Sequence, residues 1–152
     1  MIKNQKQYEY SQELIKSFES SLSAIRERGQ KKNDVWVKIK RDSLKSHLDA
    51  LKAEIAEYEH LINHNSDRPI VLKLSDIKYL PQMIIKARIA AKISQKELAQ
   101  RTGLTEEQIK EYEARDYQTA SFLDFLFVLD ALDIQVQKGE FLIPVSAFAS
   151  KS

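Results

Sequence analysis

The sequence predicts a mainly α-helical protein, in which an N-terminal antiparallel helical hairpin precedes a small helical bundle that ends in short β strands. Three observations predict this fold class. Apolar residues recur at helical spacing along most of the chain, glycine and proline number only 3 each among 152 residues, and a polar segment closed by Pro69 interrupts the pattern. We place the two domains at residues 1–64 and 69–152 on either side of that segment.

Composition excludes several classes of protein. The chain is 43% hydrophobic and 30% charged, which is typical of a folded, soluble protein. It has no cysteine, which excludes a disulfide scaffold, a thiol nucleophile and a cysteine-ligated zinc site, and which fits a reducing cytoplasm. No apolar run reaches the roughly 18 residues of a membrane span, and the polar start lacks a signal-peptide core. We therefore expect a cytoplasmic protein that does not bind a membrane.

The first domain is predicted to consist of two long helices. The first runs from an N-cap at Ser11 to about Gly29, and its apolar residues are Leu14, Ile15, Phe18, Leu22 and Ile25. After a turn the second runs to about Asn63 and carries a heptad seam, made of Leu44, Leu48, Leu51, Ile55, Tyr58 and Ile62. This coiled-coil pattern needs a partner, either the first helix folded back antiparallel or the same helix of a second chain.

Basic residues are concentrated around the predicted turn between these helices, although the net charge is only +2. This basic cluster either contacts phosphates, binds an acidic protein partner or keeps the surface soluble. The residues we expect to make partner or phosphate contacts are Arg28, Lys31, Lys32, Lys38, Lys40 and Arg41. Nearby, Val35, Trp36 and Ile39 lie off the seam and form either a small second core or an exposed patch.

The strongest local signal lies in residues 94–113. Ser94 and Thr105 each stand three residues before a glutamate or a glutamine, which is the capping-box pattern of a helix start. Gly103 stands between the two predicted helices, where a tight turn requires a residue that tolerates positive φ. The apolar residues before and after it predict two helices that cross steeply, with the small Ala99 at their closest approach.

This stretch, SQKELAQRTGLTEEQIKEYE, resembles the helix-turn-helix of the phage-repressor (Xre-like) family, and the similarity covers about residues 80–134. The resemblance implies a bundle of four or five helices that binds double-stranded DNA, in general as a homodimer. The N-terminal extension is similar to that of small regulators that include the antitoxins of toxin–antitoxin pairs, so a cognate toxin bound by the N-terminal helices is one alternative partner.

The resemblance also implies which residues contact DNA. A phosphate-contacting glutamine corresponds to Gln95, next to Lys96, and the second helix supplies the groove-facing residues and their capping glutamine, namely Thr105, Glu106, Glu107, Gln108, Lys110 and Glu111. Three of these are carboxylates, which phosphates repel, although glutamate can also accept from cytosine. Further cations, Lys86, Arg88 and Lys92, either hold phosphates or form a solvated face. The glycine usual after the second helix is missing.

After residue 133 the pattern changes from helical to alternating. Ile134-Gln135-Val136-Gln137 predicts a strand, Lys138-Gly139 a turn, and residues 140–144 a second strand. An isolated β-hairpin is marginally stable. It would therefore pack on the bundle, pair with the extended apolar run at residues 70–74, or meet a second subunit.

No motif indicates catalysis. The chain has too few glycines for a phosphate-binding loop, and His60 and His64 lack a third strong metal ligand nearby. We expect no enzyme activity, no metal and no cofactor. The leading interpretation is a dimeric helix-turn-helix regulator of transcription that represses its own gene, with an antitoxin role as a variant. The alternative is a protein-binding antitoxin or adaptor whose helix-turn-helix is a scaffold with little base readout.

Overall fold

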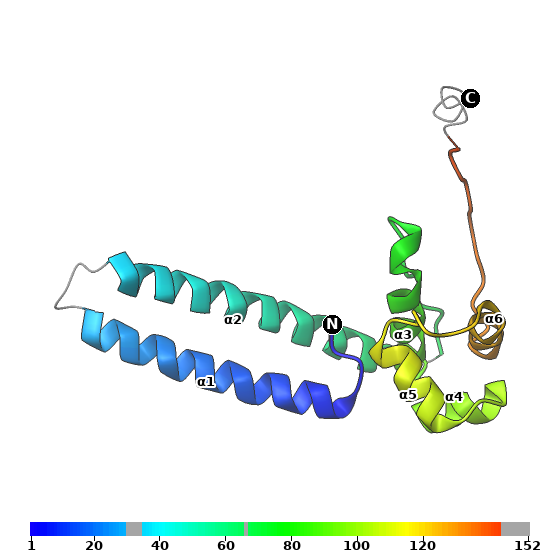
Figure 1. Cartoon of the computed structure of the whole chain (residues 1–152), viewed down its shortest axis with the longest axis horizontal. Helices are drawn as coiled ribbons and strands as arrows, with labels where there is room; N and C mark the ends of the chain where they lie inside the picture. Colours follow the sequence, from blue (N-terminus) through cyan, green and yellow to red (C-terminus); the bar gives the residue numbers. More distant parts are fainter. Residues whose placement is uncertain (30–34, 66, 144–152) are drawn as a thin grey trace.

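The computed structural model describes residues 1–29, 35–65 and 67–143, and for residues 28 and 29 the backbone only (Figure 1). Within these ranges the chain forms six α-helices, one 3-10 helix and no strand. The helices are α1 (Gln5–Gly29), α2 (Val35–Ile62), α3 (Leu80–Ala90), α4 (Gln95–Thr102), α5 (Glu106–Ala114) and α6 (Phe122–Ala131), and the 3-10 helix η1 (Ile77–Tyr79) precedes α3. The predicted mainly helical class is confirmed.

Helices α1 and α2 lie side by side and antiparallel, as an arm that projects from the bundle of α3 to α6 (Figure 1). The heptad seam of α2 therefore packs against α1 of the same chain. Tyr8 of α1 stacks on Tyr58 of α2 with 5.2 Å between ring centroids, and Lys52 Nζ lies 2.7 Å from Glu19 Oε1. Only Leu48 and Tyr58 of the seam are buried, because two helices alone cannot enclose a stripe on all sides.

Helix α1 begins at Gln5, so the prediction of Ser11 as its N-cap is wrong. Asn4 caps the helix instead, since its Oδ1 accepts a hydrogen bond from the backbone N–H of Gln7 at 3.0 Å. Ser11 lies inside the helix and is buried. The polar residues before it carry no apolar periodicity, yet glutamine, lysine and glutamate have high helix propensity, and the capped start lets the helix extend over them.

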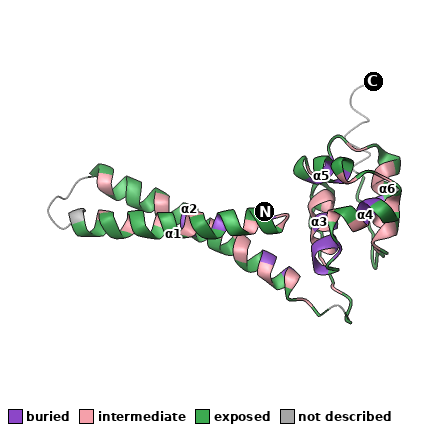
Figure 2. Ribbon diagram, turned by 90° about the horizontal axis from the view of Figure 1, so that it is seen from below, coloured by how far each residue is buried: buried purple, intermediate pink, exposed green. Residues whose placement is uncertain are grey.

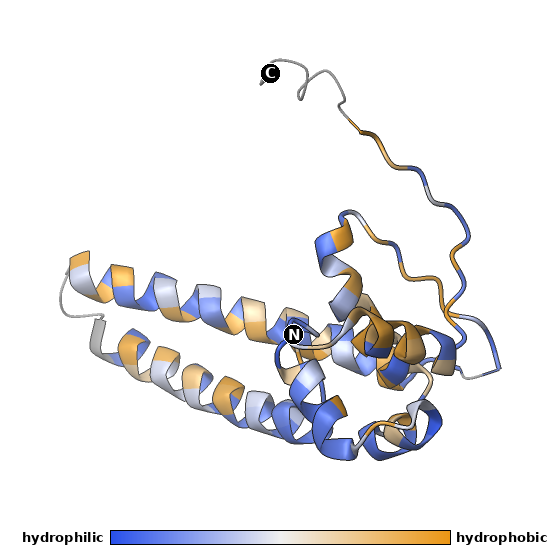
Figure 3. Ribbon diagram, turned by 45° about the vertical axis from the view of Figure 1, so that its right-hand side comes forward, coloured by the Kyte–Doolittle hydropathy of each residue, from blue (hydrophilic) through white to orange (hydrophobic). Residues whose placement is uncertain are grey.

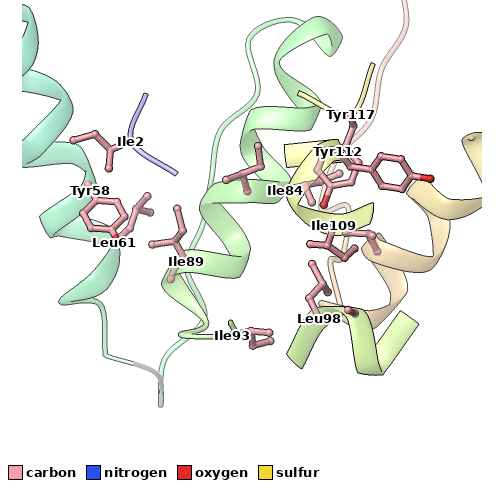
Figure 4. Close-up of a cluster of buried hydrophobic side chains, with 14 residues drawn as sticks. Ile2, Tyr58, Leu61, Ile84, Ile89, Ile93, Leu98, Ile109, Tyr112 and Tyr117 are labelled. Carbon is pink, nitrogen blue, oxygen red and sulfur yellow. The ribbon is translucent and has the colours of Figure 1, made fainter. Parts of the chain in front are cut away.

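One continuous core joins the arm to the bundle, and α3 lies at its centre (Figure 4). On one side of α3, Ile89 lies beside Tyr58 and Leu61 of α2. On the other side, Ile84 lies toward Ile109 of α5. Figure 2 shows buried residues gathered in the bundle and only scattered along the arm. The bundle thus supplies most of the apolar burial that stabilises the fold.

The predicted C-terminal β-hairpin is wrong, because residues 134–143 contain no strand and run away from the bundle as an extended tail (Figure 1). Neither Lys138 nor Gly139 takes the positive φ that a two-residue hairpin turn requires. Residues 70–74 are extended but also form no strand. Residue 144, the predicted end of the second strand, lies outside the described residues. Among the described helices, none combines the length and the apolar character that crossing a membrane requires.

Tyr117 is a buried residue of the bundle whose hydroxyl finds no hydrogen-bond partner in the described part of the chain. Its ring packs against Tyr112, with 5.9 Å between centroids, and edge-on against Phe125, at 5.6 Å. Burial and the nearby charge of Glu113 raise the pKa of this phenol well above its usual value. The hydroxyl therefore pays a desolvation penalty with no compensating bond.

We expect Tyr117→Phe to raise the free energy of unfolding by about 1–3 kcal/mol, because it removes that unpaired hydroxyl. Above about pH 10 the phenol ionises first in the unfolded chain, so the stability of the unmodified protein falls as pH rises, and the advantage of the variant grows. Urea unfolding of both proteins at about pH 7.5 and about pH 10.5 measures this. An advantage that shrinks at the higher pH would contradict the expectation.

Candidate nucleic-acid interface

Helices α4 and α5 form the predicted helix-turn-helix. Gly103 takes a left-handed φ of 73° directly after α4, as the tight turn requires. Thr105 and Gln108 form a complete capping box, in which the backbone N–H of Gln108 donates to Thr105 Oγ1 at 3.1 Å and that of Thr105 donates to Gln108 Oε1 at 2.9 Å. These two predictions are confirmed.

The capping pattern at Ser94 is confirmed only in part. Ser94 Oγ accepts from the backbone N–H of Glu97 at 3.0 Å. The Glu97 carboxylate does not return to the start of the helix, because it lies 2.6 Å from Arg101 Nη2, one turn along α4. An i,i+4 ion pair on the helix surface thus replaces the second half of the box.

A buried ion pair between α3 and α5 fixes the orientation of α5. Arg88 Nε donates to Glu113 Oε1 at 2.5 Å and Arg88 Nη2 to Glu113 Oε2 at 2.8 Å. The side chains of Arg88 and Glu113 are only 7% and 1% exposed. Arg88 Nη1 also donates to the carbonyl of Ile93 at 2.9 Å. The sequence interpretation of Arg88 as a surface cation is therefore wrong, since its charge is fully engaged inside the bundle.

The N-terminal segment reaches this ion pair and the end of α5. Lys3 Nζ donates to the carbonyl of Glu113 at 2.6 Å and to Asp116 Oδ1 at 2.8 Å, while the carbonyl of Lys3 accepts from Arg88 Nη2 at 3.0 Å. A cation at the C-terminal end of a helix satisfies free carbonyls and complements the helix dipole. Ile2 is buried in the core shared with the arm. The start of the chain thus connects the arm to α5.

Two successive residues after α5 take the place of the missing glycine. Asp116 and Tyr117 have φ values of 48° and 58°, in the left-handed region that favours glycine. Buried packing of Tyr117 and the bond from Lys3 to Asp116 hold this strained turn.

Gln95, at the start of α4, is directed toward the interior. Its Nε2 donates to Glu113 Oε2 at 2.8 Å, and the residue is half-buried. Lys96, next along the helix, is exposed. The roles of both residues as phosphate contacts stay predictions.

The outer face of α5 carries both signs of charge. Glu107, Lys110 and Glu111 are exposed, whereas Glu106 is half-buried. Lys110 Nζ lies 2.6 Å from Glu106 Oε1. The hydrogen bond that Lys110 donates to Glu106 raises the pKa of this ammonium group, so its charge stays on the face at neutral pH. Arg115 Nε lies 3.8 Å from Glu111 Oε1 at the end of the helix.

Most cations of the bundle are paired with carboxylates. Lys86 pairs with Glu57 of the arm, and Arg88, Arg101, Lys110 and Arg115 pair as described. Lys92 and Lys96 are exposed and have no carboxylate partner among the described residues. Few cations of the helix-turn-helix surface are therefore available to phosphates without breaking an ion pair.

The described residues of the basic cluster lie on the first turns of α2, at the tip of the arm and far from α5 (Figure 1). Lys38, Lys40 and Arg41 are exposed on the first turns of α2, with Arg41 Nε 3.4 Å from Asp42 Oδ1. Lys31 and Lys32 lie outside the described residues, as does the side chain of Arg28. The structure therefore separates the two groups of predicted site residues by the length of the arm.

A comparison with protein families agrees with this geometry. Two capped helices crossing at a left-handed glycine are the unit of a helix-turn-helix protein. Residues 84–138 match a family model described as helix-turn-helix, which supports the resemblance of this segment to the phage-repressor (Xre-like) family. No curated protein and no solved structure matches the chain.

The sequence did not reveal Lys3 and Glu113 as site residues, and it did not reveal that Arg88 is buried. Arg88 stands beside Lys86 and Lys92 in a basic run, which hides its burial. Helical spacing was the signal in the sequence that could have revealed the burial of Arg88 and Glu113. Arg88 lies four residues after the buried Ile84 and Glu113 four after the buried Ile109, which places both on inner faces.

We expect Arg88→Met to lower the free energy of unfolding by about 3–5 kcal/mol, because it leaves the Glu113 carboxylate buried without its partner. The double variant Arg88→Met with Glu113→Leu should be more stable than Arg88→Met alone, since it removes the stranded charge as well. Urea unfolding of the four proteins completes the cycle. Additive losses from the two substitutions would contradict a coupled pair.

Proposed function

We propose that the chain is a regulator of transcription that binds double-stranded DNA as a homodimer and represses its own gene. The observation that carries this proposal is the α4–α5 unit, a capped helix-turn-helix within the segment that matches the family. In such a unit the second helix enters the major groove with its N-terminal residues at the base edges, and two-fold dimers bind two half-sites about one helical turn apart.

In this arrangement α5 presents Thr105, Glu106, Glu107, Lys110 and Glu111 to the groove. Gln108 holds the start of the helix through its capping box, so its contribution is positional. Lys92 and Lys96 are the cations available to neighbouring phosphates.

The carboxylates of α5 set the strength of binding. Phosphates flank both sides of the major groove, and each carboxylate brought between them opposes association. Lys110 gives little compensation while it is paired with Glu106. We infer that Glu106 and Glu107 weaken binding to all sequences alike and do not read cytosine.

The double variant Glu106→Gln with Glu107→Gln should bind its own promoter and scrambled DNA more tightly, and by similar factors. Because the change releases Lys110 from Glu106, the slope of log K against log salt concentration should steepen by about 0.9, the contribution of one phosphate contact. Salt-titrated binding to both duplexes measures this.

The control is Glu13→Gln with Glu27→Gln, two exposed positions on the arm that make the same change in net charge. A selective loss at the promoter, of roughly 1–3 kcal/mol, would instead show that the glutamates read bases.

A second candidate function is that of an antitoxin or adaptor that binds a protein partner, such as a cognate toxin, through the arm. The observation that favours it is the distribution of cations. Those of the bundle are mostly paired, whereas at the end of the projecting arm Lys38 and Lys40 are exposed and have no carboxylate partner among the described residues. Arg41 is exposed there too and pairs with its neighbour Asp42. In this function the helix-turn-helix is a scaffold with weak base readout.

If the arm binds an acidic partner, changing Lys38, Lys40 and Arg41 to Gln should abolish retention of the protein encoded by the neighbouring gene when the two are co-expressed. Binding to DNA should change little, since these residues lie far from α5. The matched control replaces Lys6, Lys16 and Lys73, which are also exposed. Equal retention by the tip variant and the control would rule out the basic tip of the arm as the binding surface.

A further inference from the structure

Helix α6 is apolar on both of its faces. Its inner face packs into the bundle through Phe125, Val128 and Leu129. Its outer face exposes four large apolar side chains, between 41% and 75% of their surface, which are Phe122, Leu123, Leu126 and Phe127. A helix that is hydrophobic all round is normally buried all round. The outer face therefore requires cover that one copy of the described chain does not provide.

The tail that follows α6, residues 134–143, is also exposed and apolar. It leaves the bundle in extended form and ends in a hydrophobic run (Figure 3). Val136, Phe141, Leu142 and Ile143 are each more than two-thirds exposed. Within the described residues its backbone joins no strand, so the tail offers an open edge for pairing with another chain.

We propose that residues 135–143 pair antiparallel with the same residues of a second copy, about a two-fold axis at Gly139. This inference rests on the homodimer of the proposed function and names the surface that forms it. A two-fold contact is isologous, so the segment must be complementary to itself.

The charges of the tail select this register. In an antiparallel pair of strands, two residues that lie directly opposite each other point to the same face of the ribbon. Because the two strands here are identical and related by a two-fold axis, the numbers of every opposite pair add up to the same even number, which is twice the number of the residue on the axis. With Lys138 or Glu140 on the axis, that residue would face its own copy and repel it. With Gly139 on the axis, Lys138 faces Glu140 of the second copy, and the pair occurs twice. Val136 then faces Leu142 of the second copy.

The same register brings apolar side chains of the two tails together. The end of the second copy's tail, which carries Phe141 and Leu142, comes to lie beside residues 136 and 137. A two-stranded ribbon alone is marginally stable in water. Burial of these exposed apolar side chains between the two copies supplies part of the stabilisation that the ribbon lacks.

A single cysteine tests the register in the full-length protein. The chain has no cysteine, and a Cβ at Gly139 meets only Val136 Cγ1 at 3.8 Å, an ordinary contact. Gly139→Cys should therefore form a disulfide-linked dimer under mild oxidation. The control Gln135→Cys should not, because its two copies lie eight residue steps apart, about 27 Å, in this register.

Charge reversal tests the same pairing without a cross-link. Lys138→Glu and Glu140→Lys should each raise the dimer dissociation constant roughly tenfold, because each places like charges opposite one another at two sites. The double variant restores opposite charges and should restore the dissociation constant. Sedimentation of the full-length proteins without DNA measures all three.

The outcomes separate this inference from the function on which it rests. A dimer that forms no disulfide through Gly139→Cys, or that gives no rescue in the double charge reversal, overturns the tail interface and leaves the homodimer in place. A chain that stays monomeric overturns both. DNA binding is titrated separately with each variant, so its loss or retention reports on the helix-turn-helix alone.

Discussion

The ion pair of Arg88 with Glu113 is the interaction on which the arrangement of the molecule depends. It joins α3 to α5, Gln95 adds α4 through the same carboxylate, and Lys3 adds the start of the chain. Buried charges are costly unless their hydrogen bonds are satisfied. Here the guanidinium and the carboxylate are bonded to each other and to groups from α4 and the N-terminal segment, so α3, α4, α5 and the start of the chain all meet at this pair. These bonds hold the helix-turn-helix in a single orientation relative to the arm.

The same electrostatic arrangement limits what the surface offers to DNA. Cations that the sequence assigns to nucleic acid are engaged with carboxylates of the chain itself, as Lys110 is with Glu106 and Lys86 with Glu57. Exposed ion pairs contribute little to stability, but they reduce the positive potential that a phosphate meets.

Local patterns predicted much of the fold, and long-range contacts account for what they missed. Helical spacing and turn chemistry identified the arm, Gly103 and the Thr105 cap, because neighbouring residues determine these features. The burial of Arg88 depends on Glu113, 25 residues away, which no local window contains. The prediction of strands in the tail was wrong for the opposite reason. Its alternation is a local signal for a strand, but a strand also needs a second strand beside it.

The docking of Lys3 has a consequence for the order of folding. Its partners Glu113 and Asp116 lie 110 and 113 residues along the chain, so this contact closes one of the longest loops in the protein. Contacts within the arm, such as that of Tyr8 with Tyr58, and contacts within the helix-turn-helix close shorter loops, so we expect them to form first. During synthesis Lys3 therefore remains undocked until α5 has emerged, and its docking then holds the arm against the helix-turn-helix.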